Sequence, residues 1–136
     1  MRVIALAVIM LVCAAGARAE DAKPYPVTDC GKFTTQMDLN KCAVDNLKSA
    51  DKALNEVYQA LMAKQDGGAS KQRLKAAQRA WIAFRDRECE FEVGPQEGGG
   101  TIWPMENAGC LEGTTATRIR ELKQALTCTP LACPAH

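Results

Sequence analysis

Residues 39–61, LNKCAVDNLKSADKALNEVYQAL, carry the longest amphipathic pattern in the chain. Their apolar side chains recur every three or four residues, which places them on one face of an α-helix. These positions are Leu39, Ala43, Leu47, Ala50, Leu54, Val57 and Leu61. Thr35 is a typical N-cap, and Asp38 three residues later completes a start of the capping-box type. Gly67 and Gly68 are expected to end this helix.

Two further helices are predicted downstream. Ser70 is the expected N-cap of the first, which ends at Gly94-Pro95 because proline lacks an N–H and the residue before it avoids helical angles. Its expected apolar side consists of Leu74, Ala77, Trp81, Phe84 and Phe91. Tyr58, Trp81 and Phe84 are expected in the core. Thr114 is the predicted N-cap of the last helix, with Thr115, Ile119, Leu122 and Leu126 on its inner face.

The segment between these two helices, residues 94–109, is rich in glycine and is predicted to be a long loop. No alternation of apolar and polar residues indicates a strand. The sequence therefore predicts an all-α fold, a long helical hairpin with a third helix packed across it.

The N-terminus is typical of a secretory signal. Arg2 precedes the apolar run Val3–Val12, and Ala17-Arg18-Ala19 fits the small-x-small pattern before a cleavage site. The run is much shorter than the ~20 residues of a spanning helix. We expect cleavage after Ala19 and a periplasmic or secreted mature chain without a transmembrane helix. Acylation at Cys13 is the weaker alternative, because Val12 is not a small residue.

The cysteines predict a disulfide framework. Seven are present and Cys13 leaves with the signal, so an even number remains in a short exported chain. Pairing of neighbours gives Cys30–Cys42, Cys89–Cys110 and Cys128–Cys133, and the alternative joins the C-terminal tail to the N-terminal segment. A metal site is not expected, because the chain has no Cys-x-x-Cys pair and its one histidine is His136.

These features divide the chain into four parts. Residues 1–19 are the expected signal peptide, 20–33 an irregular N-terminal segment, 34–127 the helical domain, and 128–136 a disulfide-clipped tail. The chain has 17 Lys and Arg against 16 Asp and Glu, and Arg2 and Arg18 leave with the signal, so the mature charge is 15 − 16 = −1. A nucleic-acid partner is not expected, because such binders carry a basic excess.

Catalytic chemistry is not expected either. A Ser-His-Asp or Cys-His site needs a histidine that the fold positions, and His136 lies in a proline-rich terminus. Glu88, Glu90 and Glu92 are two residues apart, so a helix does not place them on one face as a carboxylate pair. We therefore expect a protein without catalytic residues, cofactor or metal.

Polar residues on the predicted helices indicate an interhelical network. We expect Arg85 to pair with an acid of the first helix, Asp51, while Asn55 and Gln78 satisfy neighbouring polar groups. Arg118 of the last helix is expected to join the same network.

Several stretches of the chain form a distinctive set. They are residues 36–43 (QMDLNKCA) with Ala50-Asp51, Leu54-Asn55 and Tyr58; residues 77–81 (AQRAW) with residues 84–86 (FRD) and Cys89; residues 99–105 before Cys110; and Thr115, Arg118 and Leu122. Together they span roughly residues 30–126 and resemble the LprI-like lysozyme-inhibitor family. The resemblance implies an all-helical, disulfide-containing protein of the periplasm or cell envelope that is not an enzyme.

The resemblance further implies binding to lysozyme and its inhibition. The alternative is a structural or interaction module of the envelope that meets another envelope protein or peptidoglycan without inhibition. Glu92, Glu97, Trp103 and Glu106 are the candidate contact residues, because a loop closed by a disulfide presents side chains at little ordering cost. Acidic side chains also steer association with a basic enzyme. For Trp103 the alternative is structural, with the ring folded inward onto the helices.

Overall fold

The computed structural model describes residues 23–128. Three long helices follow one another in this range with only short connections between them. They are α1 (Gln36–Lys64), α2 (Gly68–Val93) and α3 (Trp103–Thr127), with short 3₁₀ turns at Cys30–Lys32, Gln96–Gly98 and Gly100–Ile102. The predicted all-α class is confirmed. The expected cleavage after Ala19 and the Cys133 end of the expected third bridge lie outside the described residues, so both stay predictions.

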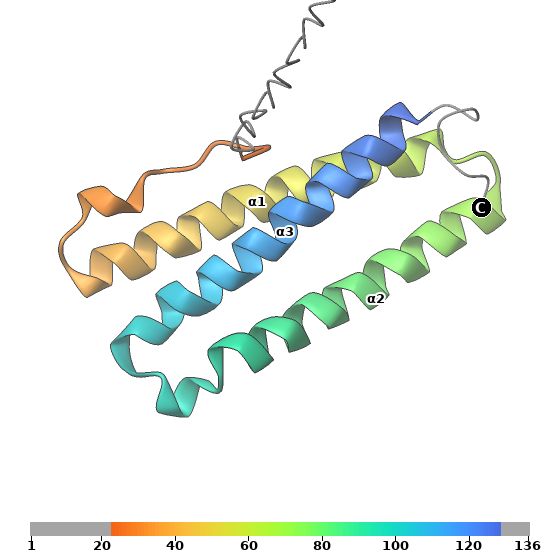
Figure 1. Ribbon diagram of the computed structural model, residues 1–136. Coiled ribbons are helices and arrows are strands. Elements are labelled where there is room, and N and C mark those ends of the chain that lie inside the picture. The colour runs from red at the N-terminus through yellow and green to blue at the C-terminus, as the bar shows by residue number, and fades with distance from the viewer. Residues whose placement is uncertain (1–22, 129–136) are drawn as a thin grey trace, which may run out of the picture.

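The three helices are not equally close to one another. α1 and α3 run side by side in the same direction, and α2 runs antiparallel to both (Figure 1). The most extensive contact joins α1 to α3, and α2 packs mainly on α3. α2 is therefore the least embedded of the three helices.

The start of α1 is the predicted one. Thr35 is the N-cap, and its hydroxyl accepts a hydrogen bond from the Asp38 N–H at 3.2 Å and donates to the Asp38 carboxylate at 2.6 Å. The helix ends at Lys64, whose ammonium donates to the Leu126 carbonyl at 2.7 Å. This bond ties the C-terminal ends of α1 and α3 together.

The start of α2 differs from the prediction. The N-cap is Gly67, with a φ of +89°, and Ser70 lies inside the first turn, where its hydroxyl accepts from Arg73 at 3.2 Å. A positive φ suits glycine, so the chain can reverse direction directly into the helix without a side-chain cap. The predicted end is confirmed: Gly94 has a φ of +79° and its N–H donates to the Glu90 carbonyl at 3.0 Å.

The start of α3 differs from the prediction, because its N-cap is Ile102, twelve residues before Thr114. Pro104 occupies the first turn, where its missing N–H has no helical partner to lose. The Thr114 hydroxyl is inside the helix and donates to the Cys110 carbonyl at 3.0 Å. The predicted loop 94–109 therefore shrinks to residues 94–102.

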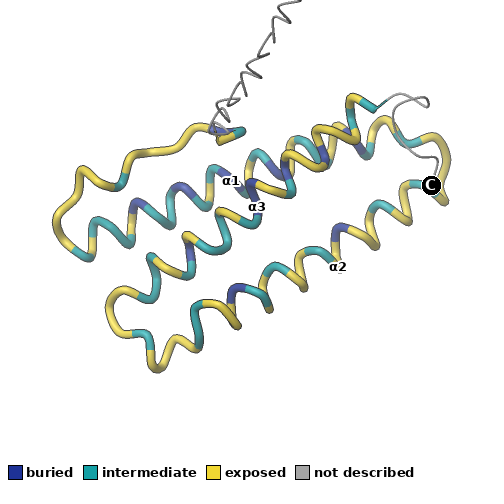
Figure 2. The backbone as a smooth tube through the Cα atoms, in the orientation of Figure 1, coloured by how far each residue is buried: buried dark blue, intermediate teal, exposed yellow. Residues whose placement is uncertain are grey.

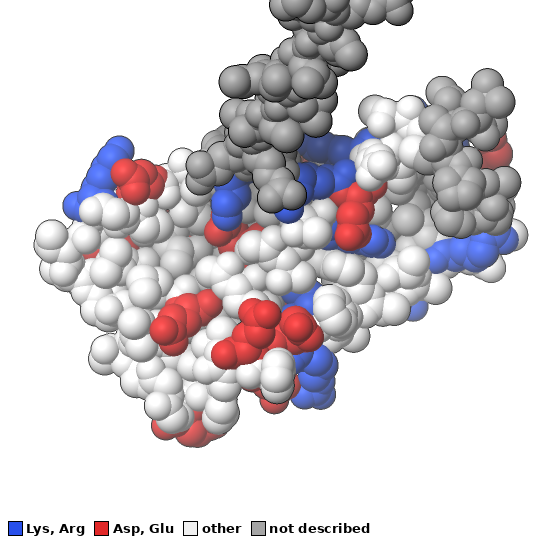
Figure 3. Space-filling view, viewed as in Figure 1, with Lys and Arg blue, Asp and Glu red and all other residues white. Residues whose placement is uncertain are grey.

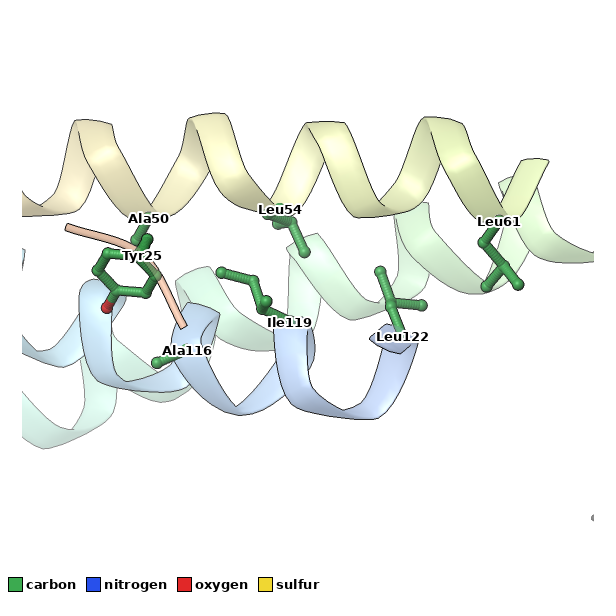
Figure 4. Close-up of a cluster of buried hydrophobic side chains, with 7 residues drawn as sticks. All are labelled: Tyr25, Ala50, Leu54, Leu61, Ala116, Ile119 and Leu122. Atoms are coloured by element: carbon green, nitrogen blue, oxygen red, sulfur yellow. The ribbon is translucent and has the colours of Figure 1, made fainter. Parts of the chain in front are cut away.

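The hydrophobic core lies mainly between α1 and α3 (Figure 4). Its buried members are Tyr25, Ala50, Leu54, Leu61, Ala116, Ile119 and Leu122. Ala50 and Ile119 are completely buried. Since no position of the predicted α1 stripe is exposed, the periodicity of residues 39–61 identified the inner face of this helix correctly.

The inner face of α2 agrees with the prediction only at Leu74 and Trp81. It runs along Leu74, Gln78, Trp81, Arg85 and Cys89, all buried or half-buried and spaced by three or four residues. Ala77 and Phe84 are exposed, and Phe91 is 84% exposed. Figure 2 shows most of α2 in the colour of exposed residues. The prediction that Phe84 belongs to the core is wrong, whereas Trp81 and Tyr58 do pack against the core.

The segment before α1 is fastened along the α1–α3 pair. The Asn46 side chain bonds both backbone groups of Thr28, accepting from its N–H at 2.8 Å and donating to its carbonyl at 2.9 Å. Tyr25 is buried beside Ala50 and Ala116 (Figure 4), and its hydroxyl donates to Glu112 at 2.6 Å. The predicted Cys30–Cys42 disulfide is present and fixes the segment to α1.

The Tyr25 contact predicts a loss of stability at alkaline pH. Burial, followed by the hydrogen bond and charge of Glu112, raises the pKa of Tyr25 well above its usual value. The unfolded chain therefore loses this proton first, and the stabilisation that is complete below pH ~10 falls as the pH rises further.

We expect the free energy of unfolding, measured by urea titration, to fall more steeply above pH ~10 in the native protein than in a Tyr25→Phe variant. At neutral pH the free energy of unfolding of the variant should be about 1 kcal/mol lower, which is the typical net contribution of one hydrogen bond. Equal slopes for the two proteins would show that Tyr25 titrates as it does in an unfolded chain.

Candidate functional site

Acidic side chains gather where α2 is joined to α3. Residues 88–113 contain six glutamates and no Lys, Arg or His. They are Glu88, Glu90, Glu92, Glu97, Glu106 and Glu112. We call this region the acidic end; in Figure 3 its carboxylates are visible at the lower left.

The opposite end of α2 is basic. Residues 64–79 contain five Lys or Arg against one acid, Asp66. The near-neutral net charge thus conceals a separation of charge along the long axis of the molecule. Such a separation orients an approaching charged partner, even though the total charge is close to zero.

Three links hold the acidic end in place. The predicted Cys89–Cys110 disulfide is present and joins the end of α2 to the beginning of α3. The Trp103 indole N–H donates to the Gly94 carbonyl at 3.0 Å, across the connection. The Asn40 amide of α1 donates to the Thr101 carbonyl at 2.9 Å. The acidic end is thus a fastened structure and not a free loop.

The four candidate contact residues lie in different settings. Glu92, Glu97 and Glu106 are exposed, at the end of α2, in the connection and in the first turn of α3 respectively. Trp103 is half-buried, and its ring packs so closely on Gly99 that a Cβ there would lie under 3.0 Å from three of its side-chain atoms. Trp103 has the inward placement that a structural role requires.

The acids of this end differ in their availability. Glu112 is occupied, because it accepts from both Tyr25 and Lys23, and Glu90 pairs with Arg87 at 2.6 Å. Glu97 and Glu106 have no hydrogen bond or ion pair within residues 23–128. These two carboxylates are free to meet a partner.

Arg85 is the centre of the polar network and links all three helices. One of its guanidinium nitrogens donates to Asp51 of α1 and to Thr115 of α3, at 3.0 and 3.2 Å. Its other donors reach Asp86 at 2.9 and 3.0 Å. The guanidinium also lies over the ring of Trp81, 5.4 Å from the ring centre. The structure places Arg85 beside Asp51, as the sequence suggested.

Gln78 and Arg118 form the second half of this network. The Arg118 side chain donates to the Gln78 carbonyl oxygen at 3.3 Å and to Glu121 at 2.9 Å. It lies on the same Trp81 ring, 5.8 Å from its centre. Asn55 is exposed and makes no hydrogen bond through its side chain within the described range, so the structure does not bring it into the network.

The sequence reasoning missed a surface on α2. Phe84 and Phe91 are seven residues apart and both exposed, with Glu88 between them on the same side of the helix. Phe84, Glu88 and Glu92 also line a groove of about 410 Å³ between α2 and α3. We call Phe84, Glu88, Phe91 and Glu92 the acidic–aromatic face. The sequence places Phe84 in the core and Phe91 on the apolar side of the helix, because hydrophobic pattern alone does not distinguish a core face from a binding face.

Comparison with known protein families identifies the family of the chain. Residues 29–122 match the family described as Lysozyme inhibitor LprI, which covers more than half of the chain. The chain belongs to the LprI family. Members of a lysozyme-inhibitor family are generally not enzymes, and the LprI match includes both disulfides seen here.

A relative of this LprI protein is an uncharacterized protein of Rhizobium meliloti (strain 1021). The two sequences are 37% identical over 130 residues, which covers 87% of this chain and 90% of the relative. No solved structure matches the chain. The disulfides and the family are consistent with a location outside the cytoplasm. None of the helices within residues 23–128 is long and apolar enough to cross a bilayer.

The close packing of Trp103 on Gly99 predicts an asymmetry between neighbouring glycines. A Gly99→Ala variant must displace the base of the Trp103 side chain, which is not flexible there, and should lose about 1–3 kcal/mol of stability. Gly98→Ala is the matched control, because nothing lies within 4 Å of the added methyl group. Urea unfolding and the NMR signal of the Trp103 indole N–H would measure both effects. Equal stabilities of the two variants would contradict the packing.

Proposed function

We propose that this protein inhibits lysozyme by direct contact through its acidic end and the adjoining acidic–aromatic face. The proposal rests on one observation: a chain of the lysozyme-inhibitor family carries six glutamates and no Lys, Arg or His in residues 88–113, a segment that the Cys89–Cys110 disulfide fastens. The contact residues are Glu92, Glu97 and Glu106, joined by Phe84, Glu88 and Phe91.

Electrostatic complementarity supports this choice of surface. Lysozyme is a basic enzyme, so a cluster of carboxylates raises the rate of encounter and orients the inhibitor before contact. Glu97 and Glu106, which have no partner within the described residues, would form the new ion pairs. The basic end of α2 would face away from the enzyme.

Binding energy would come mainly from the aromatic side chains. Charges at the rim of an interface contribute little, whereas buried aromatic anchors account for much of the affinity. Phe91 is 84% exposed and Phe84 is 55% exposed, so both have apolar area to bury on a partner. The disulfide and the Trp103–Gly94 bond fix their surroundings beforehand, which lowers the entropy lost on binding.

The proposed site of action is the periplasm or the exterior of the cell, after cleavage behind Ala19. The cysteine content and the family support this location. A second candidate function is an interaction module of the envelope that uses the same exposed phenylalanines on another protein, without inhibiting lysozyme. Inhibition itself is the property that separates the two functions.

The test is a cell-wall lysis assay in which purified, oxidised protein is titrated against lysozyme. We expect inhibition that weakens as salt is added, because the contact is partly electrostatic. A Glu92→Gln, Glu97→Gln, Glu106→Gln triple variant should need about tenfold more protein for the same inhibition, as expected for three rim charges. A Phe91→Ala variant should weaken inhibition to a similar degree.

Asp66→Asn is the matched control, since it removes an exposed acid from the basic end of α2 and should inhibit as the native protein does. Absence of inhibition by the native protein at micromolar excess would refute the proposed activity and favour the interaction module. Inhibition that survives both the triple variant and Phe91→Ala would refute only the assigned surface.

A further inference from the structure

A second concave surface lies on the other side of α2, where it faces α1. This groove has a volume of about 390 Å³, within the range of small-molecule sites. Its apolar lining includes Leu54 and Tyr58 of α1 and Ile82 of α2. None of the residues of the acidic–aromatic face takes part in it.

A buried amide forms part of this groove. Gln78 is only 7% exposed, and its carbonyl oxygen accepts from Arg118. Because arginine can only donate, this bond fixes which end of the amide faces α3 and leaves the Nε2 group for the groove. Nε2 has no hydrogen-bond partner within residues 23–128. Every fully buried polar side-chain atom in that range has a hydrogen-bond partner. Because Nε2 has none there, it must be at least partly exposed.

Three further polar groups of the groove can donate. Within the described range, the Tyr58 hydroxyl, the Lys75 ammonium and the Arg79 guanidinium have no hydrogen bond or ion pair. All three line the groove with Gln78. The acid in the lining, Asp51, is already paired with Arg85. The groove therefore offers several unsatisfied donors, two of them cationic, beside an apolar wall.

We propose that this groove binds the carboxyl-terminal end of an apolar peptide. The terminal carboxylate would lie between Lys75 and Arg79, the peptide carbonyls would accept from Gln78 and Tyr58, and an apolar side chain would cover Leu54. A peptide matches the full donor set, because it combines a carboxylate with neutral acceptors. A simple fatty acid would leave the Gln78 and Tyr58 donors unpaired.

The experiment is an NMR titration of the oxidised protein with acetyl-Phe-Leu that carries a free carboxylate. We expect the side-chain N–H₂ signals of Gln78 to shift, with a Kd on the order of 1 mM or tighter. The carboxyl-terminal amide of the same peptide should bind about tenfold more weakly, because it lacks the charge that Lys75 and Arg79 recognise.

Two variants and a control test the assigned residues. Gln78→Glu keeps an oxygen for Arg118 but replaces the donor with an anion, so it should abolish binding without unfolding the protein. Lys75→Gln with Arg79→Gln should weaken binding about tenfold. Lys71→Gln is the control, because Lys71 is exposed on the same helix and outside the groove.

Absence of a shift at Gln78 with acetyl-Phe-Leu at about 10 mM would overturn the proposal. The proposal would also be overturned if the peptide amide, or decanoate, bound as tightly as the peptide with a free carboxylate. Either result would show that the donor set does not select a peptide carboxylate. The lysis assay is independent of this result, since the groove and the acidic–aromatic face lie on different sides of α2.

Discussion

The rest of the structure depends on how Arg85 attaches α2 to the other two helices. This side chain is only 14% exposed and reaches Asp51 on α1 and Thr115 on α3 at the same time. Arg85 and Arg118 both lie over the ring of Trp81, so one aromatic ring contacts two guanidinium groups. A buried arginine without partners would cost several kcal/mol, which restricts α2 to the orientation that satisfies it. α2 is thus positioned by polar contacts together with Leu74, Trp81 and the Cys89–Cys110 disulfide.

This polar attachment explains why both sides of α2 remain open. A helix held by an extensive apolar stripe would bury its phenylalanines, whereas α2 keeps Phe84 and Phe91 in solvent on one side. On the other side its separation from α1 leaves the groove that contains Gln78. The most extensive packing is between α1 and α3, which provide a stable platform, and α2 displays two surfaces of different chemistry. One is acidic and aromatic, and the other is lined by donors and apolar side chains.

How far the sequence predicts this arrangement depends on the element. The inner face of α1 was predicted correctly because its residues are apolar. The start of α1 was predicted correctly because its cap is a local motif, Thr35 with Asp38. The α2 face was right at Leu74 and Trp81 but wrong at Ala77, Phe84 and Phe91, because apolar character alone does not show which side of a helix is buried. Gln78 and Arg85 complete the inner face, and their partners Arg118 and Thr115 lie 40 and 30 residues away. The early start of α3 was missed because Pro104 and Gly109 resemble loop residues, although the fold holds them in a helix. The charge separation was readable in the sequence, but only the fold shows that it lies along one axis.

Native-state hydrogen exchange of the oxidised protein, followed amide by amide, tests most directly whether α2 is held by Arg85 and the disulfide on a more stable α1–α3 pair. We expect the central amides of α2 to exchange through a partial opening of lower free energy than those of α1 and α3. An Arg85→Met variant should lower the opening free energy of α2 far more than that of the other helices. A single opening free energy shared by all three helices, unchanged in its distribution by the variant, would show that Arg85 does not hold α2 in place.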